Sequence, residues 1–351
     1  MIASFESGGI SMRSFRRTVR LAGISALALI CSLTLPAVAQ QKIPIQIALG
    51  DVEIQKVPFQ IALDKGIYAK NGLDADVFYT TGAADFARRS SVNVPASMVK
   101  PDEAPILISG GTPLAVGVVT DIRNWDKVIL ATTDPIVHWN IYARPEIKRV
   151  EDLKGKRIGF SGVGAMTHYI ALNLCRRMGW DPNFDVSLMA GALTVDGLKD
   201  GRVDAIIGDN MHGTMARAAG FPVLLDLTQW KMPIAGSGVR TTRTWVRENK
   251  EAARRFTKSM VEAIALFKKD PNVAYESMKK WWGVTDVEKL KAMYADAATL
   301  PRKPYPSVEG LKLTMQTYDS HEMRRHKPED FFDASFIKEL DDNGYIDSLY
   351  K

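Results

Sequence analysis

Cysteine is nearly missing from this chain, whose 351 residues include only Cys31 and Cys175. If an N-terminal segment that carries Cys31 is removed, one thiol remains, which excludes an intrachain disulfide and a cysteine-based zinc site. Histidine is also scarce, and His321 and His326 are five residues apart, a spacing that does not place them on one helical face. We therefore expect no metal site and no cofactor.

Charge of one sign is not in large excess. The formal net charge is +6, and loss of an N-terminal segment with four arginines and Glu6 would lower it to +3. So small a charge argues against nucleic acid or an anionic membrane as a partner. The composition is 46% hydrophobic and 25% charged, which is typical of a packed globular protein of one large or two ordinary domains.

A long hydrophobic run occurs only near the N-terminus. Four arginines between residues 13 and 20 precede the almost uncharged run 21–35, and the small residues of 36–39 follow it. The run is shorter than the roughly 20 residues that a membrane-spanning helix needs. This pattern predicts a signal peptide over residues 1–39 that is cleaved near Ala39, with a retained membrane anchor as the alternative.

Beyond that segment, apolar runs of strand length alternate with longer amphipathic stretches. The spacing predicts a helix over 58–70, a helix capped by Thr81, and nearly continuous helix from Thr242 to Lys269 and beyond. The alternation predicts an α/β protein with open, mostly parallel sheets and a helical C-terminal region. Strands are expected at 43–49, 76–79, 105–109, 127–131, 136–142, 156–160, 185–189, 204–207 and 223–226.

A weak internal repeat suggests two lobes. Residues 61–78 and 170–188 both read as a helix, a glycine and then a strand, about a hundred residues apart. The alternative is that any two helix–strand units look alike.

A glycine-rich turn at 159–164 follows one expected strand and opens a helix. Unpaired N–H groups at a helix N-terminus suit a carboxylate, sulfonate or nitrate group. The glycine order is not that of the dinucleotide-binding motif, and neither a P-loop nor a nucleophile elbow is present. The turn predicts Gly164, Met166, Thr167 and His168 as ligand-binding residues. The alternative is that the glycines serve only to form the turn.

Similar turns follow other expected strands. In open α/β sheets, ligands bind beyond the carboxyl ends of the strands, and residues 138–140 lie where the chain would cross between lobes. His168 and His212 could equally cap helices or pack in a core. The further candidates for ligand binding are Asp51, Thr81, Gly82, Ala83, Gly111, Thr112, His138, Trp139, Asn210 and His212.

Four stretches carry a resemblance to a known family. They are residues 57–73, with the run VPFQIALDKGIY, 150–159, 201–205 and 245–249. Together they resemble the nitrate/sulfonate/taurine-type, thiamine-pyrimidine-precursor-like solute-binding proteins of ABC transporters, over roughly residues 43–270. Residues 97–104 depart from the family's usual pattern. The resemblance therefore says least about which residues of this sequence form the lobe 1 half of the binding pocket.

The resemblance implies a type II periplasmic binding protein fold, with two α/β lobes joined by a two-crossover hinge. Lobe 1 would comprise 40–134 plus 236–351, including the C-terminal helices, and lobe 2 would comprise 135–235. The expected function is that of a periplasmic protein, a monomer and not an enzyme. It would bind a small organic solute, with an anionic solute among the candidates, between the lobes and deliver it to an ABC permease in the inner membrane. The alternative is an enzyme on the same fold, in pyrimidine or menaquinone biosynthesis, which the export signal and the single remaining thiol disfavour.

Overall fold

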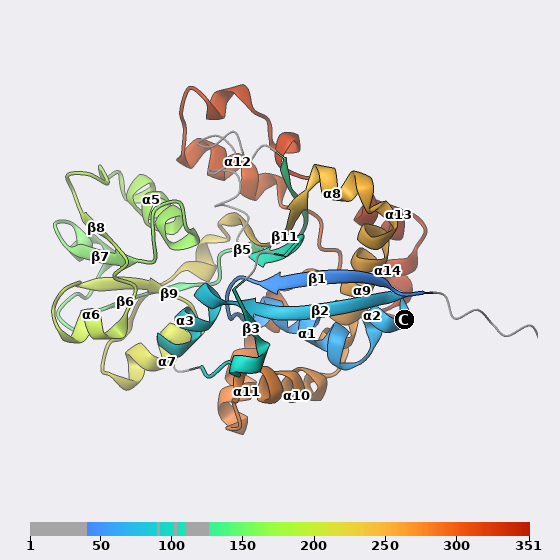
Figure 1. Ribbon diagram of the computed structural model, residues 1–351. Coiled ribbons are helices and arrows are strands. Elements are labelled where there is room, and N and C mark those ends of the chain that lie inside the picture. The colour runs from blue at the N-terminus through green and yellow to red at the C-terminus, as the bar shows by residue number, and fades with distance from the viewer. Residues whose placement is uncertain (1–40, 90–91, 102–103, 110–125) are drawn as a thin grey trace, which may run out of the picture. The chain divides into compact units, whose positions relative to one another are not determined.

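The computed structural model describes residues 41–89, 92–101, 104–109 and 126–351 (Figure 1). The predicted signal peptide, residues 1–39, lies outside the described residues.

The first sheet has the strand order β3-β2-β1-β4-β11-β5. Strands β3, β2, β1 and β4 run parallel to one another, whereas β11 runs antiparallel to both β4 and β5. Its strands are β1 (Ile43–Leu49), β2 (Leu73–Thr80), β3 (Val99–Lys100), β4 (Ile106–Ser109), β5 (Lys127–Ile136) and β11 (Pro233–Thr242).

The second sheet has the strand order β10-β6-β9-β7-β8. Here β7 lies parallel to β8 and β9, and β6 lies antiparallel to β9 and β10. Its strands are β6 (Asn140–Ala143), β7 (Arg157–Phe160), β8 (Ser187–Ala190), β9 (Ala205–Gly208) and β10 (Val223–Asp226).

The chain passes between the two sheets twice. Residues 137–139 lead from β5 to β6, and residues 227–232 lead from β10 back to β11. Each antiparallel pair named above includes a strand next to one of these crossings, because a chain that leaves a sheet and returns to the same edge of it runs in the opposite direction. The sheets are therefore mixed, and the expectation of mostly parallel strands holds only away from the crossings.

Helices cover the sheets and fill the C-terminal third of the chain. On the second sheet, α5 packs on one face, and α6 and α7 pack on the other (Figure 1). The helices are α1 (Val57–Asp64), α2 (Ile67–Lys70), α3 (Thr81–Arg89), α5 (Met166–Met178), α6 (Val195–Lys199), α7 (Asn210–Ala218), α8 (Arg243–Glu248), α9 (Lys250–Lys269), α10 (Pro271–Trp282), α11 (Val287–Tyr294), α12 (Val308–Thr317), α13 (Ser335–Asp342) and α14 (Tyr345–Ser348).

The largest hydrophobic core lies between the first sheet and α1, α9 and α10. The apolar face expected for the long helix packs there, since Phe256, Met260, Ile264 and Phe267 are all buried. A second core lies under α5, and a third connects β5 and β11 to α12. The α/β class and the helical C-terminal region are thus confirmed.

Several expected boundaries are wrong for local reasons. The helix predicted over 58–70 is two helices, because Gly66 takes a left-handed φ of 67° between them. The cap of α3 is Thr80 and not Thr81, since the amide of Ala83 donates to Thr80 Oγ1 at 3.2 Å. The helix after Thr242 is interrupted at Asn249.

Candidate functional site

A group of buried charged side chains lies at the carboxyl end of β1. Asp51 and Glu53 follow that strand directly, and Lys56 ends the 3-10 helix Ile54–Lys56 that precedes α1. The side chain of Lys56 is completely buried, whereas those of Asp51 and Glu53 retain 25% and 18% exposure. A buried ammonium requires compensating charge and hydrogen bonds.

Among the described residues, two carboxyl groups and a hydroxyl contact the Lys56 ammonium. It forms an ion pair with Asp51, lies 3.4 Å from Glu53 Oε2, and donates to Ser237 Oγ at 2.6 Å. Ser237 Oγ also donates to Glu53 Oε2 at 3.3 Å, and the Ser237 carbonyl accepts from Thr133 Oγ1 at 2.7 Å. These bonds hold the end of β1 against β5 and β11, the two strands that lead to and from the second sheet.

Ser237 has a left-handed φ of 39°, which is rare for a residue with a side chain. Such a conformation costs about 1–3 kcal/mol and persists only where surrounding contacts enforce it. The enforcing contacts here are the hydrogen bonds of its hydroxyl and carbonyl groups.

Two histidine–carboxylate pairs complete the group. Asp209 caps α7 by accepting from the His212 amide at 2.9 Å, and its Oδ1 also lies 2.7 Å from His212 Nδ1. In the first crossing, His138 Nδ1 lies 3.2 Å from Asp134 Oδ1, and His138 Nε2 lies 3.2 Å from Gln55 Nε2. We call Asp51, Glu53, Lys56, Asp134, His138, Asp209 and His212 the charged cluster.

The members of the charged cluster affect one another's protonation. Burial, and then the carboxylate of Asp51, raise the pKa of Glu53 from 4.5 to about 7, although the Lys56 ammonium opposes this change. Burial also raises the pKa of Asp51 despite its ion pair with Lys56. For Lys56, burial lowers the pKa, but the attraction of the two carboxylates outweighs it, so the pKa is raised.

The Asp209–His212 pair behaves as an ion pair. Burial alone would raise the pKa of Asp209, but the charge and hydrogen bonds of His212 leave that pKa lowered. Burial alone would lower the pKa of His212, but Asp209 leaves it raised. Glu53 contributes to the raised pKa of His212, and Asp209 to that of Glu53. The groups that follow β1 and β9 therefore share one electrostatic environment.

Glu53 should make stability depend on pH near neutrality. Its folded pKa of about 7 exceeds its ordinary 4.5, so between these values the folded state binds more protons than the unfolded state. The free energy of unfolding should therefore fall as pH rises from 5 to 8, by up to about 3 kcal/mol. Urea unfolding of the wild type and Glu53→Gln at both pH values measures the effect.

The variant comparison isolates Glu53 from its neighbours. His212 also contributes stability that is lost as pH rises through its raised pKa, whereas Asp209 contributes stability lost only as pH falls. Glu53→Gln should flatten the decline between pH 5 and 8 and leave the variant the more stable protein at pH 8. Parallel declines in both proteins would contradict the assignment.

Three of the residues nominated from sequence belong to the charged cluster: Asp51, His138 and His212. Trp139, next to His138, is 8% exposed and packs in the core under α5. Asn210 is the first residue of α7, directly after Asp209.

The glycine-rich turn uses its polar atoms internally. Thr167 Oγ1 accepts from the Ser161 amide at 2.9 Å, and His168 Nδ1 accepts from the Gly164 amide at 3.1 Å. Tyr318 Oη also lies 3.1 Å from His168 Nδ1. Burial lowers the pKa of His168, which favours the neutral ring. These contacts favour the plain-turn interpretation for Thr167 and His168.

Met166 of the same helix lies close to β11. Its Cε would be 3.0 Å from a Cβ placed on Gly236, the residue before Ser237. The carbonyl of Asp134 would be 2.9 Å from that same Cβ. Met166 therefore lies near the charged cluster, and Gly236 leaves the room for this approach.

Three other candidates, Thr81, Gly82 and Ala83, belong to α3 and are not members of the charged cluster. Thr81 and Gly82 line a pocket of about 430 Å³ together with Lys127, Arg240 and Trp245, whereas Ala83 is buried in the core. Gly111 and Thr112 lie outside the described residues.

Sequence reasoning missed Glu53, Lys56, Asp134, Asp209 and Ser237. Glu53 and Lys56 could have been found from sequence, because they belong to an Asp-x-Glu-x-x-Lys run directly after a strand. So many charged residues are unusual where a strand leads directly into a buried helix. No local signal pointed to Ser237, because its role depends on the register of β11 against distant strands.

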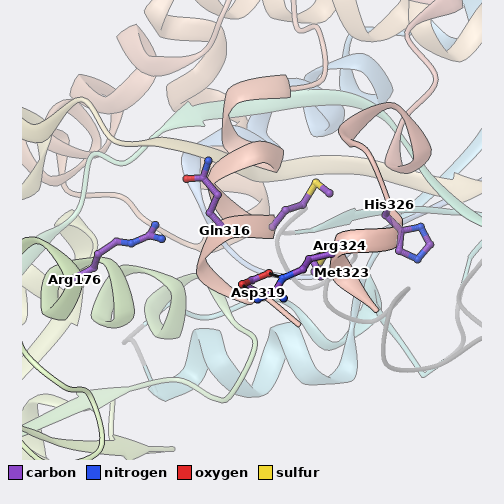
Figure 2. A pocket seen from close by; sticks show the side chains of 7 residues that line it. Arg176, Gln316, Asp319, Met323, Arg324 and His326 are labelled. Carbon is purple, nitrogen blue, oxygen red and sulfur yellow. Dashed lines mark hydrogen bonds and ion pairs between the residues drawn. The ribbon is translucent and has the colours of Figure 1, made fainter. Parts of the chain in front are cut away.

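A second pocket, of about 340 Å³, lies between α5 and the segment that follows α12 (Figure 2). Arg176 approaches from α5, and the other labelled side chains come from α12 and the residues after it. Within it, Arg324 is already paired with Asp319 at 2.5 and 2.7 Å. None of the candidate residues that the structure describes lines this pocket, which therefore does not carry the candidate site.

Within the part of the chain that the structure describes, no group of three or more His, Cys, Asp or Glu residues could hold a metal ion. None of the helices described here has the length and apolar character needed to span a membrane.

Comparisons with known proteins agree with this architecture. The family model described as NMT1/THI5 like matches residues 127–274, which include both crossings and the second sheet. Comparison with curated proteins gives no match.

Solved structures share the fold at low sequence identity. The periplasmic aliphatic sulphonate-binding protein SsuA from Escherichia coli is 19% identical with a TM-score of 0.59, over 81% of this chain and 93% of that one. The periplasmic nitrate-binding protein NrtA from Synechocystis PCC 6803 is 12% identical with a TM-score of 0.67, over 89% and 91%. The desulfurization enzyme DSZB is 14% identical with a TM-score of 0.53, over 86% and 99%. The chain therefore has the periplasmic binding protein fold and contains a region, residues 127–274, that matches the NMT1/THI5-like family.

Proposed function

We propose that this protein is an exported solute-binding component of an ABC importer, which captures a small organic solute and delivers it to a permease. Its fold is shared with sulphonate- and nitrate-binding periplasmic proteins, which supports this class. Residues 40–134 plus 236–351 would form one lobe, residues 135–235 the other, and residues 1–39 the cleaved signal peptide.

One observation carries the proposal: the charged cluster draws its members from both sheets and from a crossing between them. Asp51, Glu53 and Lys56 follow β1, His138 lies in the first crossing, and Asp209 and His212 follow β9. In open α/β sheets this edge, beyond the carboxyl ends of the strands, is where ligands bind. A solute that contacts groups from both sheets would favour the arrangement in which these groups converge.

The second candidate is an enzyme on the same fold, which the likeness to a desulfurization enzyme favours. Ser237 with Lys56 is the obvious hydroxyl–base pair, since their polar atoms lie 2.6 Å apart. However, the neighbouring carboxylates raise the pKa of Lys56 and keep it protonated, so it cannot take the serine proton. Burial raises the pKa of the Cys175 thiol to about 11, which makes it a poor nucleophile. Binding without turnover fits these groups better.

Thermal unfolding with a panel of sulfonates, carboxylates, pyrimidines, amines and amino acids tests the proposal. At least one solute should stabilise the protein, by about 2.7 kcal/mol at a hundred times its dissociation constant. Mass spectrometry of the stabilising solute after incubation should recover it unchanged.

Variants should locate that solute at the charged cluster. Asp51→Asn from the first sheet and His212→Gln from the second should each weaken its affinity at least tenfold. Asp196→Asn is the matched control, because its side chain is 73% exposed and pairs with Lys199 on the surface. Conversion of the solute to product would favour the enzyme, and equal affinities in all variants would place the site elsewhere.

A further inference from the structure

We propose that the solute recognised at the charged cluster carries a cationic nitrogen with N–H donors, such as an ammonium or amidinium group, and not an anionic group. This inference rests on the proposed function and specifies the chemical class of its ligand. It separates this protein from the sulphonate- and nitrate-binding proteins that share its fold.

The balance of charge is the first argument. The cluster contains four carboxyl groups, those of Asp51, Glu53, Asp134 and Asp209, against one ammonium and two imidazoles. With a pKa of about 7, Glu53 is ionised in about half of the molecules at neutral pH and in most of them at pH 8. The ammonium of Lys56 is already shared between two carboxylates and the Ser237 hydroxyl. No cationic charge of Lys56 is left over for an incoming anion.

Accessibility points the same way. The side chain of Lys56 has no exposed surface, whereas 25% of Asp51 and 18% of Glu53 is exposed. A solute that approaches these groups therefore meets the side chains of Asp51 and Glu53 before it meets the ammonium. Carboxylates repel an anion and attract a cation, and the interaction is strengthened by the low polarisability of buried surroundings.

An unsatisfied acceptor is the second, independent observation. Gln55 is 1% exposed, and its Oε1 accepts no hydrogen bond among the described residues. Its amide nitrogen lies 3.2 Å from His138 Nε2, while His138 Nδ1 faces Asp134. The amide group donates to His138 in this arrangement, which leaves the oxygen without a donor. Buried acceptors of this kind need a partner, and an N–H group of the solute would supply it.

Matched pairs of probes that share an apolar body but differ in charge give the test. The pairs are butylamine against butanesulfonate and benzamidine against benzoate, titrated by calorimetry into purified protein freed of bound solute by dialysis. We expect the cation of at least one pair to bind tenfold or more tightly than its anion. Asp51→Asn should lower the cation's affinity at least tenfold, and Gln55→Met should lower it as well.

Asp196→Asn is again the control and should leave both affinities unchanged, and circular dichroism establishes that each variant is folded. If a variant at Asp51 does not fold, the comparison of the probe pairs on the wild type decides the question alone. Tighter binding of an anion overturns this inference but leaves the proposed solute-binding function in place. If no probe binds while an uncharged solute from the broader panel does, the inference is again overturned and the function stands. Failure of every solute in both panels overturns both.

Discussion

Replacing Lys56 by methionine is expected to lower the free energy of unfolding by about 3–5 kcal/mol at pH 8. Methionine preserves most of the volume of the lysine side chain, so the loss arises from charge and not from packing. The substitution leaves the partly buried Asp51 and Glu53 without their cation, and it removes the donor to Ser237 Oγ. Urea unfolding followed by fluorescence of the tryptophans measures the change.

Two companion variants make this result specific. Lys56→Met combined with Asp51→Asn and Glu53→Gln should recover most of the lost stability, because no unpaired buried charge remains. Lys65→Met is the surface control: its side chain is 40% exposed and its partner Glu276 is 65% exposed, so a change within about 1 kcal/mol is expected. Equal losses for the lysine variants at positions 56 and 65 would refute the idea that burial makes the first ion pair important.

The second large effect is expected at Gly310, in the first turn of α12. A Cβ at this position would lie 2.1 Å from the carbonyl carbon of Ile234 and 2.4 Å from the amide nitrogen of Ala235, both in the backbone of β11. Strand β11 is held between β4 and β5, so it cannot move aside. Gly310→Ala should destabilise the protein by about 3 kcal/mol through this overpacking. Thermal or urea unfolding measures it.

Without the clash, Gly310→Ala should stabilise the protein, because alanine favours a helix over glycine by about 1 kcal/mol. A loss of stability therefore indicates overpacking. Gly82→Ala in α3 serves as the control, since a Cβ there meets nothing within 4 Å. That substitution should be neutral or slightly stabilising. A Gly310→Ala protein as stable as Gly82→Ala would mean that α12 does not pack on β11 as described.

Most elements were predictable because they depend on local patterns. Strand β10 occupies the expected residues 223–226, and the Thr242 hydroxyl accepts from the Trp245 amide, as a helix cap should. The repeated helix–glycine–strand pattern is also real: Gly72 and Gly179 both take left-handed φ values before β2 and β8. Such features follow from apolar spacing and from the conformational freedom of glycine.

The predictions failed where distant contacts decide the structure. A continuous strand was expected over 136–142, but the chain leaves the first sheet after Ile136 and enters the second at Asn140. Residues 137–139, between these strands, have the composition of a strand. They belong to neither sheet because the strands with which β5 and β6 pair lie in different sheets. The site could be predicted only in part. Asp51, His138 and His212 follow strands or lie in the crossing, which local patterns indicate, whereas the contact of Ser237 with Lys56 depends on the register of β11.

The amino-acid sequence by itself determined the α/β class, the positions of most helices and strands, and the edge of the sheets at which polar side chains gather. Only the tertiary structure decided which of those side chains meet, because the hydrogen bond of Lys56 to Ser237 joins residues 181 positions apart. It also decided that the glycine-rich turn uses Thr167 and His168 for its own hydrogen bonds. Local patterns report the conformation of a segment, but the charge and solvation of a buried group depend on whichever distant segments pack around it.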